Sequence, residues 1–499
     1  MTENSKSFKQ FWQNLFCEFK NDIKFDNKSL LIVILCCFLT TSSIVLSFFV
    51  DAFFYISGVI SVISIIFLNI FTKNMVNGLS FLLYLFPFSM VLFIPGKNIG
   101  FYPLLVGIQV LSFAFEWIFS IVKKQRKIKW SIFIPLVIFI VYVFSLFLIG
   151  NFSIKCFVSF SLGALFLFSI IENIEKIKIK ETFLFFIVGM LICCFWGLFQ
   201  KSYPNLENFF NATTALGVYR YSALFPNTNA FTMYILISIG MLSVLYLKRE
   251  LTIIFYPIFC IFLIIAFSTL SKMTFIVLIA FLISLIIIRV FFFKKDKRKI
   301  IAVFSIAITV LIAVFIQFDN CVLTTKRLLL PFQNGINQSN STGIDSGEEL
   351  SNSLDGQSKI DRDLIANEFT TGRLDLWKIC IKSTFFDIRS ALLGKNSGRE
   401  VDVLNTVEGS PHNSFLQILY TTGLFGFMLL MLYLMVCFIK IAKSSFDISG
   451  VTLFVVTVLC FCSLDAFSYI GFILIALVYL AMFKSTGEKN EILIKEEGM

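Results

Sequence analysis

The chain contains one histidine, His412, and its surroundings suit proton transfer. An imidazole exchanges a proton near neutral pH and can act as a general acid or base. His412 follows a long polar stretch and directly precedes an apolar run, which places it at a membrane boundary. A histidine that only hydrogen-bonds to nearby backbone would suit the same position. His412 is therefore a candidate catalytic residue, with a purely structural role as the alternative.

Three cations occupy polar connections that are far apart in the sequence. Arg220 lies in the stretch 219–229, Lys272 follows Ser271 in a short corner, and Arg373 opens a segment with helical spacing. Guanidinium groups bind phosphate through two parallel hydrogen bonds, a geometry that lysine lacks. Together these cations would suit a pyrophosphate at the level of lipid headgroups. The alternative is that each side chain only reaches toward the headgroups around it.

The elements that must position these residues are predicted by composition. Hydrophobic residues make up 58% of the 499 residues and charged residues only 15%. A membrane-spanning helix needs about 20 mostly apolar residues, so the chain has enough for many spans. A soluble globular enzyme, a nucleic-acid-binding protein and a disordered scaffold are thereby excluded. The net charge of +11 is interpreted as the Lys and Arg excess of cytoplasmic loops rather than as a nucleic-acid surface.

Apolar runs with few charges predict an all-α polytopic membrane protein with about 14 transmembrane helices, within a range of 12–14. The runs are 30–50, 52–71, 79–96, 101–121, 131–150, 152–171, 182–200, 227–247, 251–270, 273–293, 299–318, 415–439, 449–466 and 467–483.

Basic clusters predict the orientation. Those at 123–129, 176–180, 248–249, 294–299 and 440–443 fall on one side, which the positive-inside rule makes cytoplasmic. Both termini are then cytoplasmic. The expected organisation is a cytoplasmic amphipathic N-terminal segment (1–28), a transmembrane bundle of about 11 spans (29–318), a large extracytoplasmic loop (319–412), C-terminal spans (413–484) and a cytoplasmic tail (485–499).

The large loop divides into two parts. Residues 334–372 are polar and acidic, so they are predicted to be mobile. From about 373 to 388, Leu374, Trp377, Ile381 and Phe385 recur at helical spacing and predict an amphipathic helix against the outer face of the bundle. The loop also contains Cys321 and Cys380; a disulfide between them and two free thiols both remain open.

Two glycines follow the histidine within the next apolar run. Gly423 and Gly426 lie about one helical turn apart, where small residues permit the close approach of a helix or a lipid chain. Packing against the protein is the favoured interpretation, and direct contact with a ligand is the alternative.

Several of these residues lie in patterns that resemble the O-antigen ligase and O-antigen (surface polysaccharide) polymerase superfamily. Arg220-x-x-x-Leu224 is similar to the family's R-x3-L element. His412-Asn413, nine residues and then Gly423-x-x-Gly426 is similar to its H-[NSQ]-x9-G-x-x-G element.

Further likenesses extend the resemblance over roughly 200–435. Asn227-Thr228-Asn229 resembles an N-P-N-x-F stretch, with Thr in place of the usual Pro. Lys272 follows Ser271 where the family commonly has a Ser-Arg pair, and Arg373-Leu374-x-Leu376-Trp377 resembles the start of its large-loop helix.

The resemblance implies a membrane-embedded, GT-C-like glycosyltransferase with an undecaprenyl-pyrophosphate-linked glycan as donor and a second glycan as acceptor. Arg220 and Arg373 would stabilise the negative charge of the leaving pyrophosphate. His412 would deprotonate the acceptor hydroxyl or contact the phosphate. The residues expected to bind substrate are Lys272, Asn227, Asn229, Asn413, Trp377, Gly423 and Gly426.

Acidic residues that could serve a metal are few. Asp51 follows the first run, and Asp361 and Asp363 lie in the acidic segment. We interpret them as non-catalytic and expect an inverting enzyme without a metal or another cofactor.

The sequence is compatible with three functions. The favoured one is polymerisation of lipid-linked repeat units at the outer face of a bacterial cytoplasmic membrane. A ligase that transfers the glycan to a different acceptor shares the same donor chemistry and is the first alternative. A flippase or transporter is the second, but it predicts internal repeats, and none relates the two halves. The expected partners are the donor and acceptor glycans, the bilayer, a flippase and a chain-length regulator, without nucleic acid.

Overall fold

The computed structural model is almost entirely helical over the residues that it describes. These are 30–47, 50, 52–72, 75–89, 92–94, 99–124, 129–150, 152–199, 214–215, 218–219, 223, 225, 228–292, 299–341, 373–395, 413–462 and 469–483. Seven described helices are long and apolar enough to cross a membrane, or eight if one bent pair counts as a span. The predicted class, an all-α polytopic membrane protein, is therefore confirmed.

The first half of the chain alternates helices with short turns. Its elements are α2 (Leu30–Ser47), α3 (Ala52–Phe71), α4 (Met75–Leu85), η1 (Phe86–Phe88), β1 (Phe93–Ile94), β2 (Ile99–Gly100), α5 (Phe101–Val122), α6 (Trp130–Leu148), α7 (Ile154–Glu172), η2 (Ile174–Lys176), α8 (Ile179–Phe199), β3 (Thr214–Ala215), β4 (Val218–Tyr219) and α9 (Thr228–Leu247). The strands form two antiparallel pairs, β1 with β2 and β3 with β4.

The second half continues in the same way. Its elements are α10 (Phe255–Ser268), α11 (Lys272–Ile287), η5 (Ile288–Phe292), α12 (Lys299–Ile316), α13 (Phe318–Ser341), α15 (Arg373–Thr384), α16 (Ile388–Leu393), α17 (Ser414–Ser445), η7 (Ile448–Gly450), α18 (Val451–Phe461) and α19 (Tyr469–Ala481). Each predicted apolar run overlaps one of the helices. The run 79–96 matches least well, because α4 ends at Leu85 and a short 3-10 turn containing Pro87 follows.

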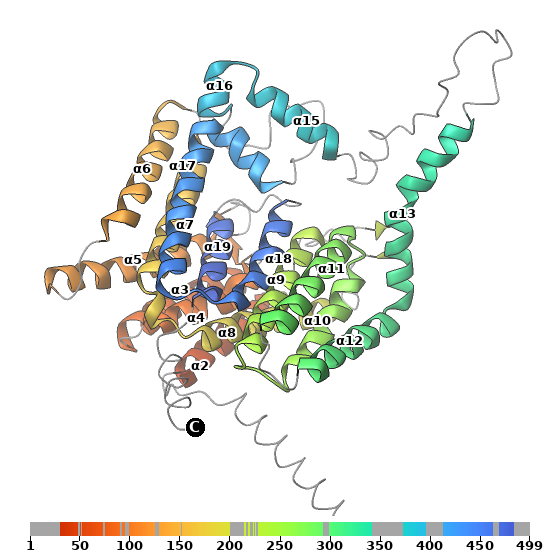
Figure 1. The fold of residues 1–499 in the computed structure, drawn as a ribbon. Coiled ribbons are helices and arrows are strands. Elements are labelled where there is room, and N and C mark those ends of the chain that lie inside the picture. The colour runs from red at the N-terminus through yellow and green to blue at the C-terminus, as the bar shows by residue number, and fades with distance from the viewer. Residues whose placement is uncertain are drawn as a thin grey trace, which may run out of the picture.

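The centre of the bundle is α9, which packs against α8, α10, α11 and α18 (Figure 1). Within its most apolar 18-residue window, 94% of the residues are buried inside the protein, compared with 33% for α6. Helices nearer the periphery point large apolar side chains outward, such as Phe119, Val141 and Phe315. An apolar exterior of this kind matches a lipid environment.

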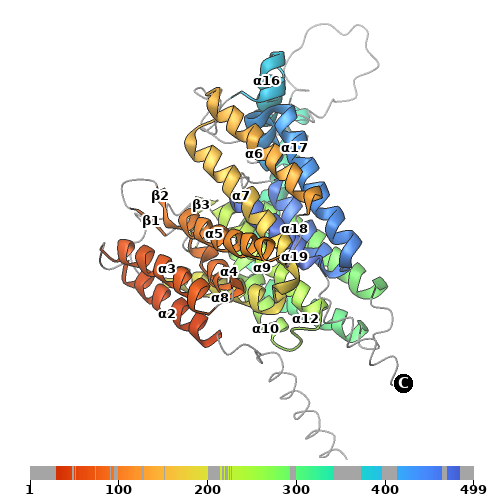
Figure 2. The ribbon, with the colours of Figure 1, turned by 90° about the vertical axis from the view of Figure 1, so that its left-hand side faces the viewer.

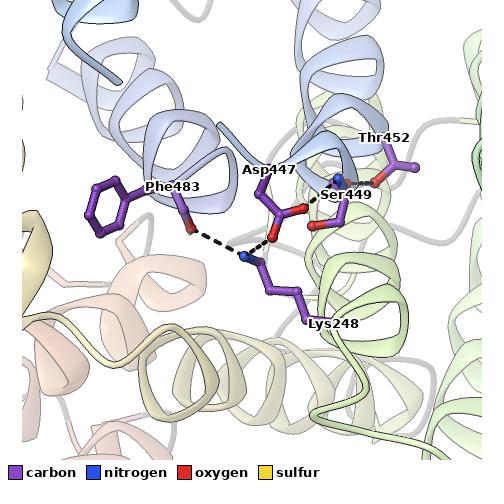
Figure 3. Close-up of polar contacts among 5 residues, drawn as sticks. All are labelled: Lys248, Asp447, Ser449, Thr452 and Phe483. Atoms are coloured by element: carbon purple, nitrogen blue, oxygen red, sulfur yellow. Dashed lines mark hydrogen bonds and ion pairs between the residues drawn. The ribbon is translucent and has the colours of Figure 1, made fainter. Parts of the chain in front are cut away.

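One end of the bundle is held by ion pairs, and we call it the basic end. Lys248 at the end of α9 contacts Asp447 at 2.5 Å and donates to the carbonyl oxygen of Phe483 at 3.2 Å (Figure 3). Lys440 of α17 pairs with Glu172 at the end of α7, at 2.8 Å. These contacts tie together helix ends that are hundreds of residues apart in the sequence.

A third pair, Lys176 with Glu116, joins η2 to α5. Lys176, Lys248 and Lys440 come from three different predicted basic clusters. They share one end of the bundle, as a positive-inside pattern requires.

The opposite end, which we call the loop end, carries α15 and α16 and the first residues of α9, α11 and α17. Figures 1 and 2 show α16 at this end, far from α10 and α12. A helix runs over Arg373–Thr384, where the sequence predicts an amphipathic one, and it packs on α17 together with α16.

The sequence predicts that a loop begins at residue 319 and that it is mobile from residue 334. The structure differs in the stretch after α12. α13 continues as a helix to Ser341, bent by 88° from α12 at a one-residue break. Cys321 and Thr324 are buried three residues apart on this helix, which contacts α10 and α11. Packing of that face stabilises a helix in a sequence too polar to predict one. Residues 342–372, the N-terminal segment 1–28 and the tail 485–499 lie outside the described residues.

A glycine breaks α17. Gly423 has φ 66° and ψ −179°, which interrupts the helix nine residues after its start. Figure 1 shows the ribbon changing direction near the top of α17. The predicted span 415–439 is thus two pieces: a first segment, 414–422, beneath α15 and α16, and a long second segment that runs to the basic end.

Candidate functional site

Of the seven residues that the sequence predicts to bind substrate, the structure describes six. They are Asn229, Lys272, Trp377, Asn413, Gly423 and Gly426. His412, Arg220 and Asn227 lie outside the described residues. Arg373 is the first residue of α15, and only its backbone is described.

Asn229 and Lys272 come together at a corner between α10 and α11. The Ser271 hydroxyl donates to the Asn229 side-chain oxygen at 3.4 Å, and Lys272 is the first residue of α11. The corner turns sharply because Leu270 adopts a left-handed conformation, with φ 52°. Ser271 is buried and Lys272 is half-buried, so the lysine stem packs at the rim of the protein.

A second cation reaches the same corner. Arg327 of α13 is half-buried, and its guanidinium donates to the carbonyl oxygen of Leu270. Sequence reasoning missed Arg327, since it lay in a stretch interpreted as loop. The three-residue spacing of Cys321, Thr324 and Arg327 was the available signal for a helix face. We call Asn229, Leu270, Ser271, Lys272 and Arg327 the Leu270 corner.

Asn413 holds the start of α17. Its side-chain oxygen accepts hydrogen bonds from the backbone N–H groups of Phe415 and Leu416, at 3.0 and 3.1 Å, which is a helix N-cap. Its amide nitrogen donates to the carbonyl oxygen of Cys462, at the end of α18, at 3.2 Å. Asn413 therefore fixes the backbone next to His412 against the bundle.

The loop-end helices join α17 where two glycines meet. Gly394, after α16, has φ 81° and ψ 166°, and Gly423 has φ 66° and ψ −179°. Only glycine adopts these conformations without strain. A Cβ on Gly423 would lie under 3.0 Å from the Gly394 nitrogen and the Leu392 carbonyl group. A Cβ on Gly394 would lie 2.8 Å from the Gly423 nitrogen. We call this contact the glycine joint.

Hydrogen bonds surround the glycine joint. The Tyr142 hydroxyl of α6 donates to the Thr422 carbonyl oxygen at 2.6 Å and lies 3.4 Å from the Leu392 carbonyl oxygen. The backbone N–H of Lys395 donates to the Tyr420 carbonyl oxygen at 3.0 Å. Sequence reasoning missed Tyr142, because nothing in α6 marks it among other aromatic residues.

Gly426 makes room for this tyrosine. A Cβ on Gly426 would lie 2.5 Å from the Tyr142 ring and 2.5 Å from the Thr422 Cβ. Both glycines of the predicted motif therefore pack against protein groups, which was the interpretation favoured from sequence. Their contact with a ligand stays a prediction.

α15 and α16 are attached to the first segment of α17 by side chains as well. Leu376 and Cys380 of α15 pack with Tyr420, and Trp377 is half-buried beside them. The Lys395 ammonium donates to the Ser383 hydroxyl at 3.0 Å. Cys321 and Cys380 are both free thiols.

Asp387 caps α16. Its carboxylate accepts from the backbone N–H and from the hydroxyl of Ser390, each at 2.8 Å. These hydrogen bonds stabilise the charged form and lower the pKa of Asp387 below its usual value.

The described site residues thus form two groups at the loop end, the Leu270 corner and the glycine joint with its helices. The link between them is α18, which packs against α9 and α11 and whose end holds Asn413. α9, α11 and α17 all begin at this end, so their positive dipole ends and two cations favour a bound anion.

Within the described ranges, no group of three or more His, Cys, Asp or Glu side chains could hold a metal ion. In comparisons with known proteins, no family model, curated protein or solved structure matches the chain.

Proposed function

We propose that this chain is a membrane-embedded glycosyltransferase that joins polyprenyl-pyrophosphate-linked oligosaccharide repeat units into a surface polysaccharide. The Leu270 corner is the observation that carries the proposal. It gathers Lys272, Arg327 and the Asn229 amide from α11, α13 and α9 at the end of an apolar bundle. Cations beside helix N-termini at a membrane boundary suit a lipid-linked diphosphate.

The finer architecture belongs to the same proposal. The bundle crosses a bacterial cytoplasmic membrane about fourteen times in a GT-C-like arrangement, with both termini and the basic end in the cytoplasm. The loop end then faces outward, where lipid-linked repeat units await polymerisation. The ion pairs of Lys176, Lys248 and Lys440 at the other end support this orientation.

The proposed reaction is an inverting glycosyl transfer. The acceptor hydroxyl oxygen forms a bond to the anomeric carbon while the bond from that carbon to the pyrophosphate oxygen breaks. The electron pair of the broken bond stays on the pyrophosphate, where Arg220 and Arg373 balance the charge. His412 takes the acceptor proton. The N-cap bonds of Asn413 support this role, since they fix the backbone adjoining the imidazole.

The test uses cells in which the gene for this protein is deleted and variants are expressed in its place. We expect Arg220→Ala to reduce glycan lengthening by about 10²–10³-fold, the usual effect of removing one transition-state donor. His412→Ala should reduce it by about 10²–10⁴-fold, the usual effect of removing a general base. Lipid-linked single repeat units should accumulate on the outer face. Arg389→Ala removes an exposed arginine of α16 at the loop end. This control variant should leave the length of the glycan unchanged.

The same measurement separates the alternatives. Loss of transfer to a final acceptor, with long lipid-linked chains retained, would identify a ligase. Repeat units held on the cytoplasmic face would identify a flippase. Normal chain length in His412→Ala cells would refute the enzymatic proposal.

A further inference from the structure

A cavity of about 390 Å³ lies between α2, α4 and α8, away from the loop-end site. α4 packs against both α2 and α8. The cavity's long walls are apolar side chains spaced one turn apart: Ile34 and Phe38 on α2, and Leu184, Val188 and Ile192 on α8. Their spacing of four residues makes each wall a straight stripe along its helix.

The cavity opens toward the bilayer. Ile34, Phe38 and Val188 line it and are 47%, 65% and 44% exposed, on helices with apolar outer surfaces. Water is a poor occupant, because the hydroxyl groups of Thr41 and Tyr84 are hydrogen-bonded to each other in a lining that is otherwise apolar. A hydrocarbon chain is the occupant whose chemistry matches these walls.

The length of the groove matches one leaflet. From Leu30 to Thr41, the α2 wall extends about 16 Å at a helical rise of ~1.5 Å per residue. The hydrocarbon core of a bilayer is about 30 Å thick, so one leaflet contributes about 15 Å. The Thr41–Tyr84 pair therefore closes the groove near the bilayer midplane.

The other end of the groove reaches the basic end of the bundle. Lys180 lies one turn before Leu184 on the same stripe of α8. Lys178, just before α8 begins, pairs with Glu181 at 3.2 Å, so this turn of α8 is rich in charged groups. An ammonium at the mouth of an apolar groove attracts an anionic lipid headgroup.

We propose that this groove binds one acyl chain of an anionic phospholipid from the leaflet at the basic end, with the lipid phosphate beside Lys180. The lipid fills a space between α2 and α8 that the described residues leave open. This proposal depends on membrane insertion alone and is independent of the glycosyltransferase proposal.

The test is native mass spectrometry of the purified full-length chain in detergent, with phosphatidylglycerol or phosphatidylcholine as the added lipid. We expect the wild-type chain to retain one phosphatidylglycerol. Val188→Trp fills the groove and should lower the bound fraction at least tenfold. Val137→Trp is the matched control, because Val137 is 39% exposed on α6 and outside the groove; it should bind as the wild type does.

Lys180→Gln keeps the groove wall intact and tests the headgroup contact separately. It should retain a lipid but lose the preference for phosphatidylglycerol over phosphatidylcholine. Equal retention by the wild type and Val188→Trp, or no retained phospholipid in the wild type, would overturn the proposal. Stronger lipid binding after deletion of residues 2–28 would overturn it too, since the N-terminal segment would then be the native occupant.

Discussion

Gly423→Ala should detach α15 and α16 from α17 while leaving the membrane helices intact. The added Cβ points into the backbone of Gly394 and Leu392 at the glycine joint. Neither backbone can yield easily, because Gly394 is itself in a glycine-only conformation that carries the turn out of α16. The effect is therefore expected at the joint rather than in the core of the bundle.

The magnitude has two parts. A non-glycine residue in the Gly423 conformation costs about 1–3 kcal/mol of backbone strain. Forcing a methyl group into a packed contact costs typically another 1–3 kcal/mol. The joint should therefore lose about 2–6 kcal/mol, and each 1.4 kcal/mol changes an opening equilibrium about tenfold. Opening should increase by about 30-fold or more.

The assay is the alkylation rate of Cys380, followed by mass spectrometry on protein in detergent. Cys380 of α15 is 2% exposed and packs against Tyr420 of α17, so it reacts only when α15 moves away from α17. We expect its rate to rise at least 30-fold in Gly423→Ala. Gly394→Ala should raise the alkylation rate of Cys380 by a similar factor. The double variant should react little faster than either single variant, because both changes disrupt the same contact.

Gly150→Ala is the control. Gly150 also has a positive φ, 79°, but nothing lies within 4 Å of its Cβ position. This variant carries the backbone strain without the collision, and its Cys380 should react as in the wild type. Equal Cys380 rates in Gly423→Ala and the wild type would refute the account of the joint.

Three further predictions concern single contacts. Tyr142→Phe removes a hydrogen bond at the glycine joint and should cost about 1 kcal/mol, seen as a several-fold faster alkylation of the same cysteine. Lys248→Met leaves the Asp447 carboxylate without its cation in a largely buried site and should destabilise the protein by about 3 kcal/mol, measured as a lower thermal midpoint; adding Asp447→Leu should restore most of the loss. The lowered pKa of Asp387 means that its cap stabilises α16 fully above the unfolded-state pKa of about 4, and that this stabilisation is lost as the pH falls through the lower folded-state pKa. Protease sensitivity of α16 should rise over that acid range in the wild type and be independent of pH there in Asp387→Asn; the same acid response in both would contradict the capping role.

Much of the helical framework follows from sequence, because the length and apolarity of a run are local properties. Each predicted run overlaps a described helix, and the helix at Arg373 begins where Leu374, Trp377 and their neighbours show helical spacing. The lysines of separate connections also share one end, as their pattern predicts.

Which helix is central does not follow from sequence. α9 and α6 are both strongly apolar, yet one is enclosed by protein and the other faces outward. A lipid tail and a protein interior are equally apolar, so side-chain chemistry does not distinguish the two surroundings. Only the packing of α8, α10, α11 and α18 around α9 decides it.

The candidate site shows the same division. The sequence by itself marked Lys272 as a cation between two apolar runs, Asn229 through a family-like motif, and Gly423 and Gly426 as small residues one turn apart within an apolar run. Tertiary structure alone brought Arg327 to Leu270 and Tyr142 to the glycine joint, across 57 and 280 residues of chain. Such contacts depend on how distant helices pack, and no local window of sequence contains that information.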